Sequence, residues 1–335
     1  MRLITYRRDN QEKIGAWIDS DSSVVDLEFA ARQQGTGNLG PFASMVDFIA
    51  AGEECWSAAR RWVQHPKRES VFESAACEVL APLPVPPQMR DFLAFEQHLL
   101  NGFAASKKIR ASLAADPVAE LERVERDGAF SIPAVWYKKP LYYITNRYSV
   151  VGSDVDVRWP HYSKIMDYEL ELAAVIGKPA LNVPASSARA HIFGFTIFND
   201  FSARDEQMIV MEGRLGPGKG KEFDGGNALG PCIVTLDEIG DYNALSMRAR
   251  INGETWSSGN STDMHYKFDD MISYLSQSQR LHPGEVFCSG TVGTGCGAEQ
   301  MRFLNSGDVV ELEIEKIGIL RNRVWLHTRV EGPGS

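Results

Sequence analysis

Acidic side chains occupy every second position at the start of the stretch MDYELELAAVIG, residues 166–177: Asp167, Glu169 and Glu171. In a β-strand alternate side chains share one face, so the three carboxylates would point the same way. An exposed acidic face over a buried apolar one is the simplest interpretation of such a pattern. Here, however, the acidic face continues as an alanine and a valine, and a strand that is apolar on both faces is buried on both.

Buried like charges repel one another and lose their hydration, so something positive must offset them. A hard divalent cation with oxygen ligands does this, and Mg²⁺ accepts a few carboxylates together with water. Mg²⁺ is therefore the expected cofactor, with Mn²⁺ and Ca²⁺ as alternatives.

Asp200 ends the almost wholly apolar run IFGFTIFND, residues 192–200, and supplies a further carboxylate. The next residues are FSARDEQ, in which Ser202 and Asp205 have the spacing of a capping box that opens a helix. The junction between a strand and a helix is a common place for binding residues. The alternative is that Asp200 only caps a helix or a turn.

A histidine and an aspartate stand seven residues apart in RDFLAFEQH, residues 90–98. Asp91 and His98 would share a face if the segment were one helix, because seven residues make two turns. The alternatives are a structural histidine and a surface aspartate.

The elements that must position these residues fall into two parts. Short strands are expected at Arg2–Tyr6, Lys13–Ile18 and Ser23–Asp26, followed by a helical stretch over Phe42–Val63. The proline-rich segment APLPVPPQ, residues 81–88, reads as a linker. We therefore expect a small N-terminal α/β domain at residues 1–80 and a larger domain at residues 81–335.

The larger domain is expected to be β-rich from Pro140 onward, with strands divided by Gly, Pro and Asn turns. Asn252-Gly253 predicts a tight hairpin. Helices are expected after Asp200 and over Lys267–Gln279. Residues 99–131 mix charges of both signs, which is typical of a solvated helical insertion. The fold class is therefore α+β, with more strand than helix.

Composition narrows the possible functions of this chain of 335 residues. The formal net charge of −9 argues against nucleic acid as a partner. Apolar runs fall short of the roughly 20 residues that cross a bilayer, and the charged start predicts a soluble, cytoplasmic protein. The five cysteines are expected to be reduced structural thiols, with a reactive Cys296 as the weaker alternative.

Together these residues resemble the fumarylacetoacetate hydrolase superfamily over most of residues 82–330. That family has an Asp and a His seven apart, a D-x-E-x-E strand, an N-D-x-S-A-R-D-x-Q segment, and an S-G-T loop after L-x-P-G-[DE]-V. All four occur here in order. The resemblance assigns these roles: metal ligands Asp91, Glu169, Glu171 and Asp200; catalytic residues His98 and Lys221; substrate contacts Arg204, Gln207, Lys139 and Thr291.

The resemblance also implies a mixed β-roll catalytic domain, a smaller N-terminal domain and a homodimer. By analogy, the insertion at residues 99–131 is a lid whose Lys107, Lys108 or Arg110 would reach an anionic substrate. Two features depart from the family: the insertion is longer than in its simplest members, and the glutamate partner of the histidine differs. Some members place a glutamate three residues after the histidine, where this chain has Asn101. Others take it from a distant C-terminal loop, for which the sequence offers no clear counterpart. The partner of His98 is therefore water, Glu96 or a residue that the sequence does not identify.

The expected chemistry is the Mg²⁺-dependent hydrolysis of a carbon–carbon bond in a 1,3-dioxo acid, such as an acylpyruvate, in the catabolism of aromatic compounds. His98 would act as the base, and the negative charge would develop as a metal-stabilised enolate. Decarboxylation, hydration or isomerisation of a 2-oxo acid uses the same enolate and is the first alternative. The second is a metal-binding or ligand-binding homologue without catalysis.

Overall fold

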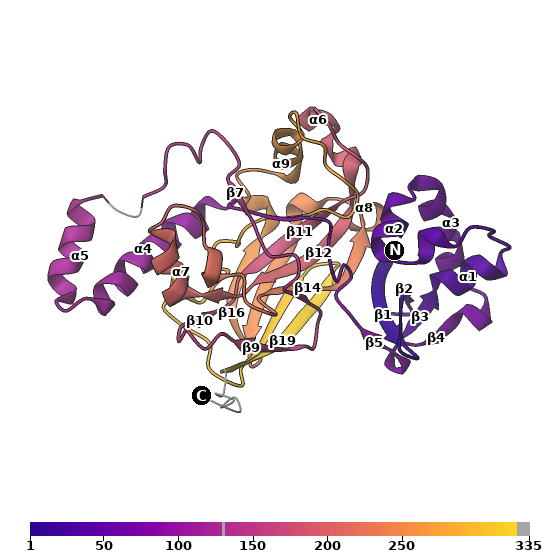
Figure 1. Ribbon diagram of the computed structural model, residues 1–335, viewed down its shortest axis with the longest axis horizontal. Coiled ribbons are helices and arrows are strands. Elements are labelled where there is room, and N and C mark those ends of the chain that lie inside the picture. The colour runs from indigo at the N-terminus through magenta and orange to yellow at the C-terminus, as the bar shows by residue number, and fades with distance from the viewer. Residues whose placement is uncertain (129–130, 327–335) are drawn as a thin grey trace, which may run out of the picture.

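The N-terminal part contributes antiparallel strands with helices packed on them (Figure 1). The computed structural model describes residues 1–128 and 131–326. Its first elements are β1 (Arg2–Arg8), β2 (Gln11–Ile18), β3 (Ser23–Asp26), α1 (Leu27–Gln33), η1 (Gly40–Phe42), α2 (Met45–Ala50), α3 (Glu53–Gln64), η2 (Arg68–Ser70), β4 (Val71–Glu73), η3 (Ser74–Ala76) and β5 (Glu78–Val79). The three expected strands are confirmed. The expected helical stretch divides into separate helices at Gly52, whose φ of 80° suits glycine.

The proline-rich linker has no helix or strand between residues 81 and 88, as expected. The chain then forms β6 (Met89–Phe92), α4 (Glu96–Leu113) and α5 (Pro117–Arg126). Most of the described residues of the insertion are therefore helical, and residues 129–130 lie outside the described ones. Helix α5 begins with the Asp116 side chain accepting from the Ala119 amide, and proline follows at the first helical position.

The β-rich part begins where it was expected. Its elements are β7 (Tyr142–Ile144), β8 (Val150–Val151), β9 (Asp156–Trp159), β10 (Met166–Asp167), β11 (Leu170–Ile176), α6 (Ala185–Ala188), η4 (Arg189–His191), β12 (Ile192–Asp200), β13 (Ser202–Ala203), α7 (Arg204–Met211), η5 (Gly218–Gly220), β14 (Asn227–Thr235), α8 (Leu236–Ile239), η6 (Tyr242–Ala244), β15 (Ser246–Ile251), β16 (Glu254–Asn260), η7 (Ser261–Asp263), α9 (Phe268–Leu275), β17 (Val286–Cys288), η8 (Ala298–Gln300), β18 (Val309–Ile314) and β19 (Gly318–Leu326). The hairpin at Asn252-Gly253 is confirmed, with positive φ at both residues.

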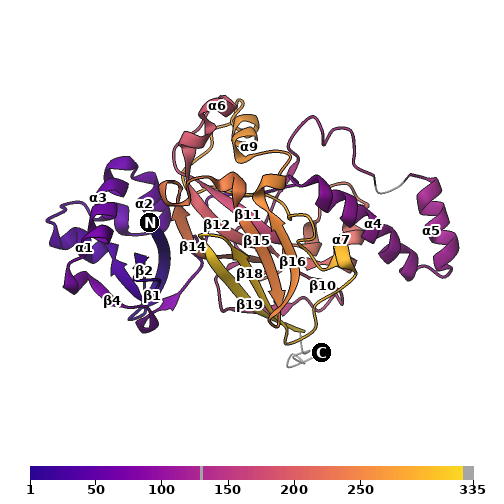
Figure 2. The same ribbon diagram turned by 180° about the vertical axis from the view of Figure 1, so that it is seen from behind.

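One large sheet runs through both parts of the chain in the order β4-β3-β2-β1-β14-β12-β11-β17-β6-β7. The N-terminal strands join the rest where β1 pairs antiparallel with β14, Arg2 opposite Val234. A second sheet contains β16, β15, β18, β19 and β9. Figure 2 shows it with the molecule turned by 180°. The fold is thus α+β, as predicted.

Strands β11, β12 and β14 lie at the centre, and every residue in them is buried. The expectation that the acidic stretch is buried on both faces is therefore confirmed for β11. The two sheets enclose a common apolar core. Charged side chains at the end of β12 and within β11 consequently lie inside the protein rather than on its surface.

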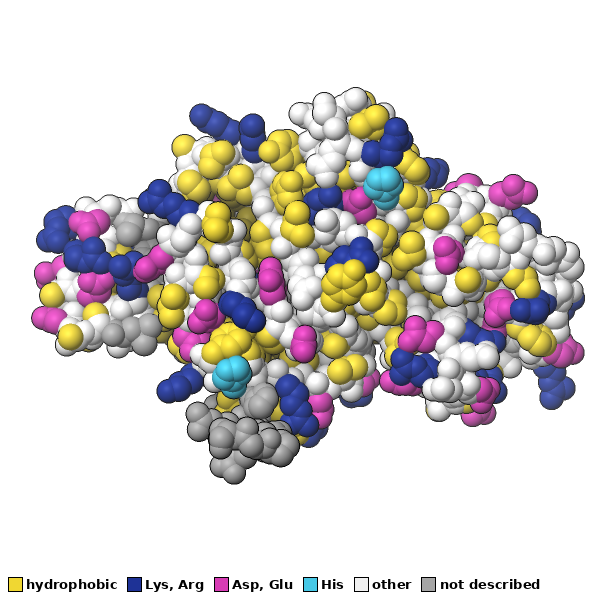
Figure 3. Space-filling view, viewed as in Figure 1, with side chains coloured by type: hydrophobic (Ala, Val, Ile, Leu, Met, Phe, Trp, Pro, Cys, Tyr) yellow, Lys and Arg dark blue, Asp and Glu magenta, His cyan; other side chains and the backbone are white. Residues whose placement is uncertain are grey.

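The two helices of the insertion extend from the end of the molecule opposite the N-terminal part (Figures 1 and 2). Basic and acidic side chains are interspersed on the face shown in Figure 3. Among the described residues, no helix combines the length and the apolar character that a membrane span requires.

Candidate active site

Four carboxylates from three separate segments meet inside the large sheet. Asp91, Glu169, Glu171 and Asp200 each offer an oxygen, and these atoms all lie within 4.8 Å of one another. The four residues are at most 4% exposed. The predicted convergence of the acidic side chains is therefore confirmed, although Asp91 reaches the cluster from a strand rather than from a helix.

Strand pairing brings Asp91 beside the glutamates. Asp91 on β6 lies opposite Cys288 on β17, and Cys288 lies opposite Ala173 on β11. Glu171 stands two residues before Ala173 and so shares its face of the strand. The β17 loop adds a direct contact, because the Gly290 amide donates to Glu171 Oε2 at 2.9 Å.

The pairing of β11 with β12 brings the remaining two carboxylates together. Leu170 lies opposite Asn199, so the residues just outside this pair, Glu169 and Asp200, face one another across the strands. The Asn199 side chain also accepts from the Glu169 amide at 3.0 Å. Two residues before Glu169, Asp167 accepts from the amides of Gly297 and Ala298 at 2.8 and 3.0 Å.

Two buried cations pair with this cluster. Lys221 Nζ lies 2.7 Å from Glu169 Oε2 and 2.6 Å from Asp200 Oδ2. Arg204 lies 2.7 Å from Asp167 and 2.8 Å from Glu169. Burial raises the pKa of Glu169, but Lys221 and Arg204 outweigh burial and bring that pKa down to about 2.

The cations do not neutralise the cluster. Five buried carboxylates, counting Asp167, face Lys221 and Arg204, so full ionisation would leave three negative charges uncompensated in this part of the described chain. Burial is the main cause that raises the pKa of Asp91 and of Glu171 well above the usual range, and neighbouring carboxylates add to it.

Oxygen atoms of the cluster are also free to bind a cation. Asp91 Oδ1, Glu171 Oε1 and Asp200 Oδ1 are buried and have no hydrogen-bond partner among the described residues. Buried polar atoms are normally paired, so three such oxygens in one place require an explanation. A hard divalent cation with oxygen ligands fits the donors and the excess negative charge.

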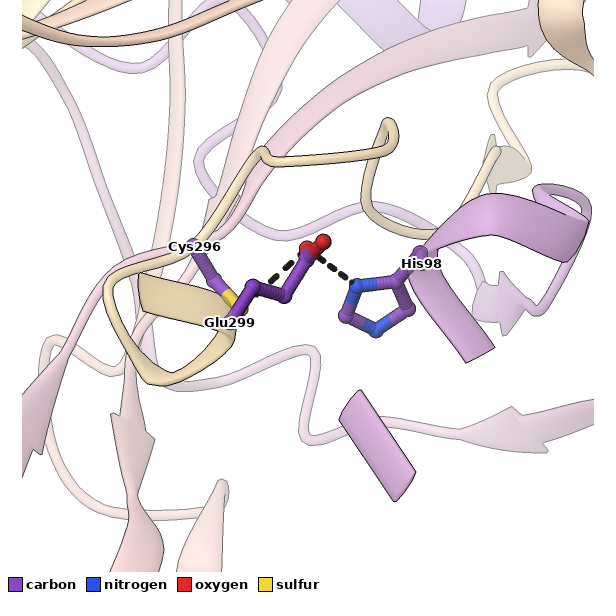
Figure 4. Close-up of side chains that lie close together, drawn as sticks. All are labelled: His98, Cys296 and Glu299. Atoms are coloured by element: carbon purple, nitrogen blue, oxygen red, sulfur yellow. Dashed lines mark hydrogen bonds and ion pairs between the residues drawn. The ribbon is translucent and has the colours of Figure 1, made fainter. Parts of the chain in front are cut away.

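A histidine–glutamate pair lies beside the carboxylates. His98 Nδ1 on α4 is 2.7 Å from Glu299 Oε1 in η8, and the imidazole Nε2 points away from the glutamate (Figure 4). Glu299 Oε2 accepts from Asn101 Nδ2 and from the Thr294 amide, both at 2.7 Å. Cys296, whose Sγ lies 3.5 Å from Glu299 Oε1, forms an antiparallel β-bridge with Glu169, which places the pair next to the cluster.

A model of the family described as "Fumarylacetoacetate (FAA) hydrolase C-terminal" matches residues 112–325. The chain belongs to this family.

Two named relatives of this chain are both oxaloacetate tautomerases. Human "Oxaloacetate tautomerase FAHD2A, mitochondrial" is 40% identical over 192 residues, which cover 56% of this chain and 59% of that protein. The chain thus spans about three-fifths of that relative. "Oxaloacetate tautomerase YisK" of Bacillus subtilis (strain 168) is 29% identical over 329 residues, 97% of this chain and all of that protein.

Solved structures of the hydrolase family share the fold. A fumarylacetoacetate hydrolase from psychrophilic Exiguobacterium antarcticum has a TM-score of 0.73 at 22% identity, covering 98% of this chain and all of that one. A maleylpyruvate hydrolase from Sphingobium sp. SYK-6 in complex with manganese(II) ion and pyruvate has a TM-score of 0.70 at 18% identity, with the same coverage.

The structure places some of the remaining residues predicted from the family resemblance near the carboxylates and others away from them. Gln207 accepts from Arg204 Nη1 at 3.0 Å and so belongs to the site. Thr291 is buried in the loop after β17, next to the glycine that binds Glu171. Lys139 is exposed and lies over the Tyr274 ring, so the structure does not bring it to the carboxylates. Among the lid cations, Arg110 pairs with Glu120 at 2.9 Å.

Two local predictions were wrong. Asp91 and His98 do not share a helix, because Asp91 lies on β6 and α4 begins only at Glu96. Ser202 and Asp205 do not form a capping box. Ala203 is the N-cap residue of α7, and its side chain makes no capping hydrogen bond. Asp205 instead accepts from the Lys164 amide, because β10 runs beside the start of the helix.

Sequence reasoning also missed two contacts of the site. The acidic partner of His98 is Glu299 from a C-terminal loop, whereas Glu96 bonds Tyr137 and Asn101 supports Glu299. The hydroxyl of Tyr143 donates to Asp200. Two clues to Glu299 were available: some family members take the glutamate from a distant C-terminal loop, and Glu299 follows the same glycine-rich loop as the expected Thr291.

Proposed function

We propose that the protein is a divalent-metal-dependent enzyme that interconverts the keto and enol forms of a small 2-oxo dicarboxylic acid of the oxaloacetate type. The observation that carries this proposal is the His98–Glu299 pair, held next to the buried carboxylates. It is supported by the likeness to oxaloacetate tautomerase YisK, which extends over 97% of this chain.

The four carboxylates Asp91, Glu169, Glu171 and Asp200 would hold the cation, with Mg²⁺ or Mn²⁺ as the proposed species. Such a cation supplies positive charge that stabilises negative charge developing on the oxygens of an oxo acid. The protein's part is to position both the cation and the substrate.

His98 is the group that moves the proton. Glu299 accepts from His98 Nδ1–H and thereby fixes the tautomer in which Nε2 carries the lone pair. In the keto-to-enol direction Nε2 takes a proton from the carbon beside the oxo group. The C–H bond breaks, a C=C bond forms, the oxo oxygen takes a proton from water to become the enol hydroxyl, and the imidazolium afterwards returns its proton to solvent. The imidazolium that forms meanwhile is stabilised by the Glu299 carboxylate.

Arg204 and Gln207 are suited to hold the carboxylates of the substrate. Arg204 Nη2 is buried and unpaired among the described residues, although the other nitrogens of this guanidinium bind Asp167, Glu169 and Gln207. A guanidinium with one free donor favours an anionic ligand, because burial makes an unmade bond costly. This supports an acidic substrate.

Hydrolysis of a carbon–carbon bond in a 1,3-dioxo acid is the second candidate, and the same pair favours it. With Glu299 as its partner, His98 would take a proton from water instead of from carbon, and the resulting hydroxide would attack the distal carbonyl. A binding protein without catalysis is less well supported, because that alternative depended on a missing glutamate partner. Homodimer formation and a cytoplasmic location stay predictions.

The test is to assay the Mg²⁺-loaded protein with oxaloacetate and with an acylpyruvate. Ultraviolet absorbance follows the enol, and ¹⁸O-labelled water reports hydrolysis. Tautomerase activity predicts faster loss of the enol band with no release of an ¹⁸O-labelled carboxylic acid, and it predicts that His98→Gln abolishes this acceleration. Cleavage of acylpyruvate into pyruvate and a carboxylic acid whose carboxyl group carries one ¹⁸O, without acceleration of the oxaloacetate tautomerisation, would reject the first candidate in favour of the second.

A further inference from the structure

A buried thiol lies beside the proton-transferring pair. Cys296 is 1% exposed, and its Sγ is 3.5 Å from Glu299 Oε1, the oxygen that also contacts His98. The three side chains come from α4 and from the loop around η8 and point toward one another (Figure 4). One ligand atom from each residue lies within 4.8 Å of the others.

The spacing of these atoms resembles that around a tetrahedral metal ion. Zn–S and Zn–O bonds of about 2.3 and 2.1 Å would place the sulfur and the oxygen roughly 3.6 Å apart. The observed Sγ–Oε1 distance is 3.5 Å. For His98 the equivalent N–O separation would be about 3.4 Å. Its Nδ1 is 2.7 Å from Oε1, so this separation would have to grow by about 0.7 Å for both atoms to bind one metal ion.

The donor atoms distinguish this group from the carboxylate cluster. Asp91, Glu169, Glu171 and Asp200 offer only hard oxygen ligands, which suit Mg²⁺. A thiolate, an imidazole and one carboxylate favour a softer ion such as Zn²⁺, for which three protein ligands and one open position are common. The two groups would therefore select different metals within one site.

We propose that His98, Cys296 and Glu299 form a second, inhibitory site for a thiophilic divalent cation such as Zn²⁺. Binding breaks the Cys296 S–H bond and releases that proton to solvent as the metal–sulfur bond forms. The proton on His98 Nδ1 moves to Nε2, so that Nδ1 can coordinate the metal. Protonated in this way, Nε2 no longer acts as a base. The inhibitory effect rests on the proposed function of the pair, whereas metal binding at this site does not.

Cobalt(II) is the probe for the site, because a cobalt–thiolate bond gives a charge-transfer band in the near ultraviolet. The full chain is kept in excess Mg²⁺, which fills the carboxylate cluster, and is titrated with Co²⁺. We expect a saturable band that Zn²⁺ abolishes by competition. In parallel, turnover of oxaloacetate by the Mg²⁺-loaded enzyme should fall as Zn²⁺ is added and recover when a chelator removes it.

Cys296→Ser is the test variant, and Cys55→Ser, which removes a half-buried thiol on α3, is the matched control. The test variant should lose the cobalt band, and its Zn²⁺ inhibition constant should rise at least about tenfold, as expected when a metal site is disrupted. The control should keep both. Each variant is compared with its own rate without Zn²⁺.

The other outcomes are decisive as well. Absence of the band in the unmodified protein, or its persistence in Cys296→Ser, would overturn the site. Loss of the band in Cys296→Ser with undiminished inhibition by Zn²⁺ would overturn its inhibitory role. If the protein turned over no oxo acid while the cobalt band depended on Cys296, the proposed function would fail but the metal site would stand.

Discussion

The four-carboxylate cluster and the His98–Glu299 pair belong to one site, but different kinds of structure build them. The cluster lies on neighbouring strands of the large sheet and is almost wholly buried. The pair joins a helix to a loop 201 residues further along the chain, and 16% of the His98 side chain stays exposed. A buried sheet holds ligands rigidly, whereas a group that transfers protons must reach substrate.

This comparison predicts that the two regions fail in different ways. A substitution in the cluster should weaken metal binding, and activity should disappear with the metal. A substitution in the pair should slow turnover while metal binding remains. Metal affinity and turnover are therefore measured on every variant below.

The largest effect is expected for Glu171→Gln. This change keeps the shape of the side chain but removes one negative charge and weakens the ligand whose Oε1 has no other partner among the described residues. Affinity for Mg²⁺ should fall by more than about 100-fold, beyond the usual effect of substitutions outside the ligand shell. Calorimetric titration measures the affinity, and turnover should be abolished at moderate Mg²⁺.

Asp205→Asn is the control for this prediction. Asp205 lies on α7 near the site but is not one of the four carboxylates of the cluster. It accepts hydrogen bonds from the Ser163 hydroxyl and the Lys164 amide. Its substitution should leave the Mg²⁺ affinity unchanged. Equal losses in both variants would mean that general disruption of the site, and not the loss of a ligand, explains the result.

Glu299→Gln is expected to reduce kcat by about 10²- to 10⁴-fold, the usual range for a general base that loses its function. The reason is that glutamine no longer stabilises the imidazolium of His98 by its charge. Mg²⁺ affinity should stay unchanged. Steady-state kinetics at saturating Mg²⁺ measure the rate, and the double variant with His98→Gln should be little slower than either single one, because the residues act as a unit.

Glu96→Gln tests the assignment of the partner. Glu96 is two residues before His98 and bonds the hydroxyl of Tyr137 on the surface. Its loss should change kcat far less than the loss of Glu299. A reversed order of the two effects would show that Glu96 is the working partner.

The sequence predicted the carboxylate cluster better than the His98–Glu299 pair, and the different structures that build these two regions explain why. Glu169 and Glu171 could be predicted because alternation along a strand is a local pattern, and the burial of both faces is visible in the neighbouring apolar residues. The strands at residues 2–26 and the Asn252-Gly253 hairpin were predictable for the same local reason.

The partner of His98 was not predictable, because no local pattern connects residues 98 and 299. Lys139 as a substrate contact stays a prediction. The structure places this residue on the surface over Tyr274. The capping box failed through a tertiary contact, since Asp205 binds the Lys164 amide beside β10 instead of the start of its own helix.

Tyr143→Phe should have a smaller effect and sharpens the picture of the cluster. The Tyr143 hydroxyl and Lys221 both donate to Asp200 Oδ2, which leaves Oδ1 to face a cation. Removing the hydroxyl should lower Mg²⁺ affinity by about tenfold, the smaller end of the range for groups that orient a ligand. Calorimetric titration checks this, and Tyr148→Phe, an exposed change, is its control. An unchanged affinity would show that Lys221 alone orients Asp200.

The smallest effect is expected for Glu120→Gln in the helical insertion. Hydrogen bonds from Arg123, and then from Arg110, hold the pKa of Glu120 at about 2, against an ordinary value of 4.5. Because this pKa is lowered in the folded protein, the ionised carboxylate stabilises the contact between α4 and α5 above about pH 4.5, and that contribution is lost as the pH falls through about 2. The residue is half-buried and its partners Arg110 and Arg123 reach solvent, so solvent screening keeps the contribution small. Amides of α5 should exchange faster in the variant at pH 7, while kcat and Mg²⁺ affinity stay unchanged, because His98 lies in the first turn of α4 and Glu299 fixes it from the other side. A fall in kcat comparable to that of Glu299→Gln would instead mean that the insertion, as well as the C-terminal loop, positions the base.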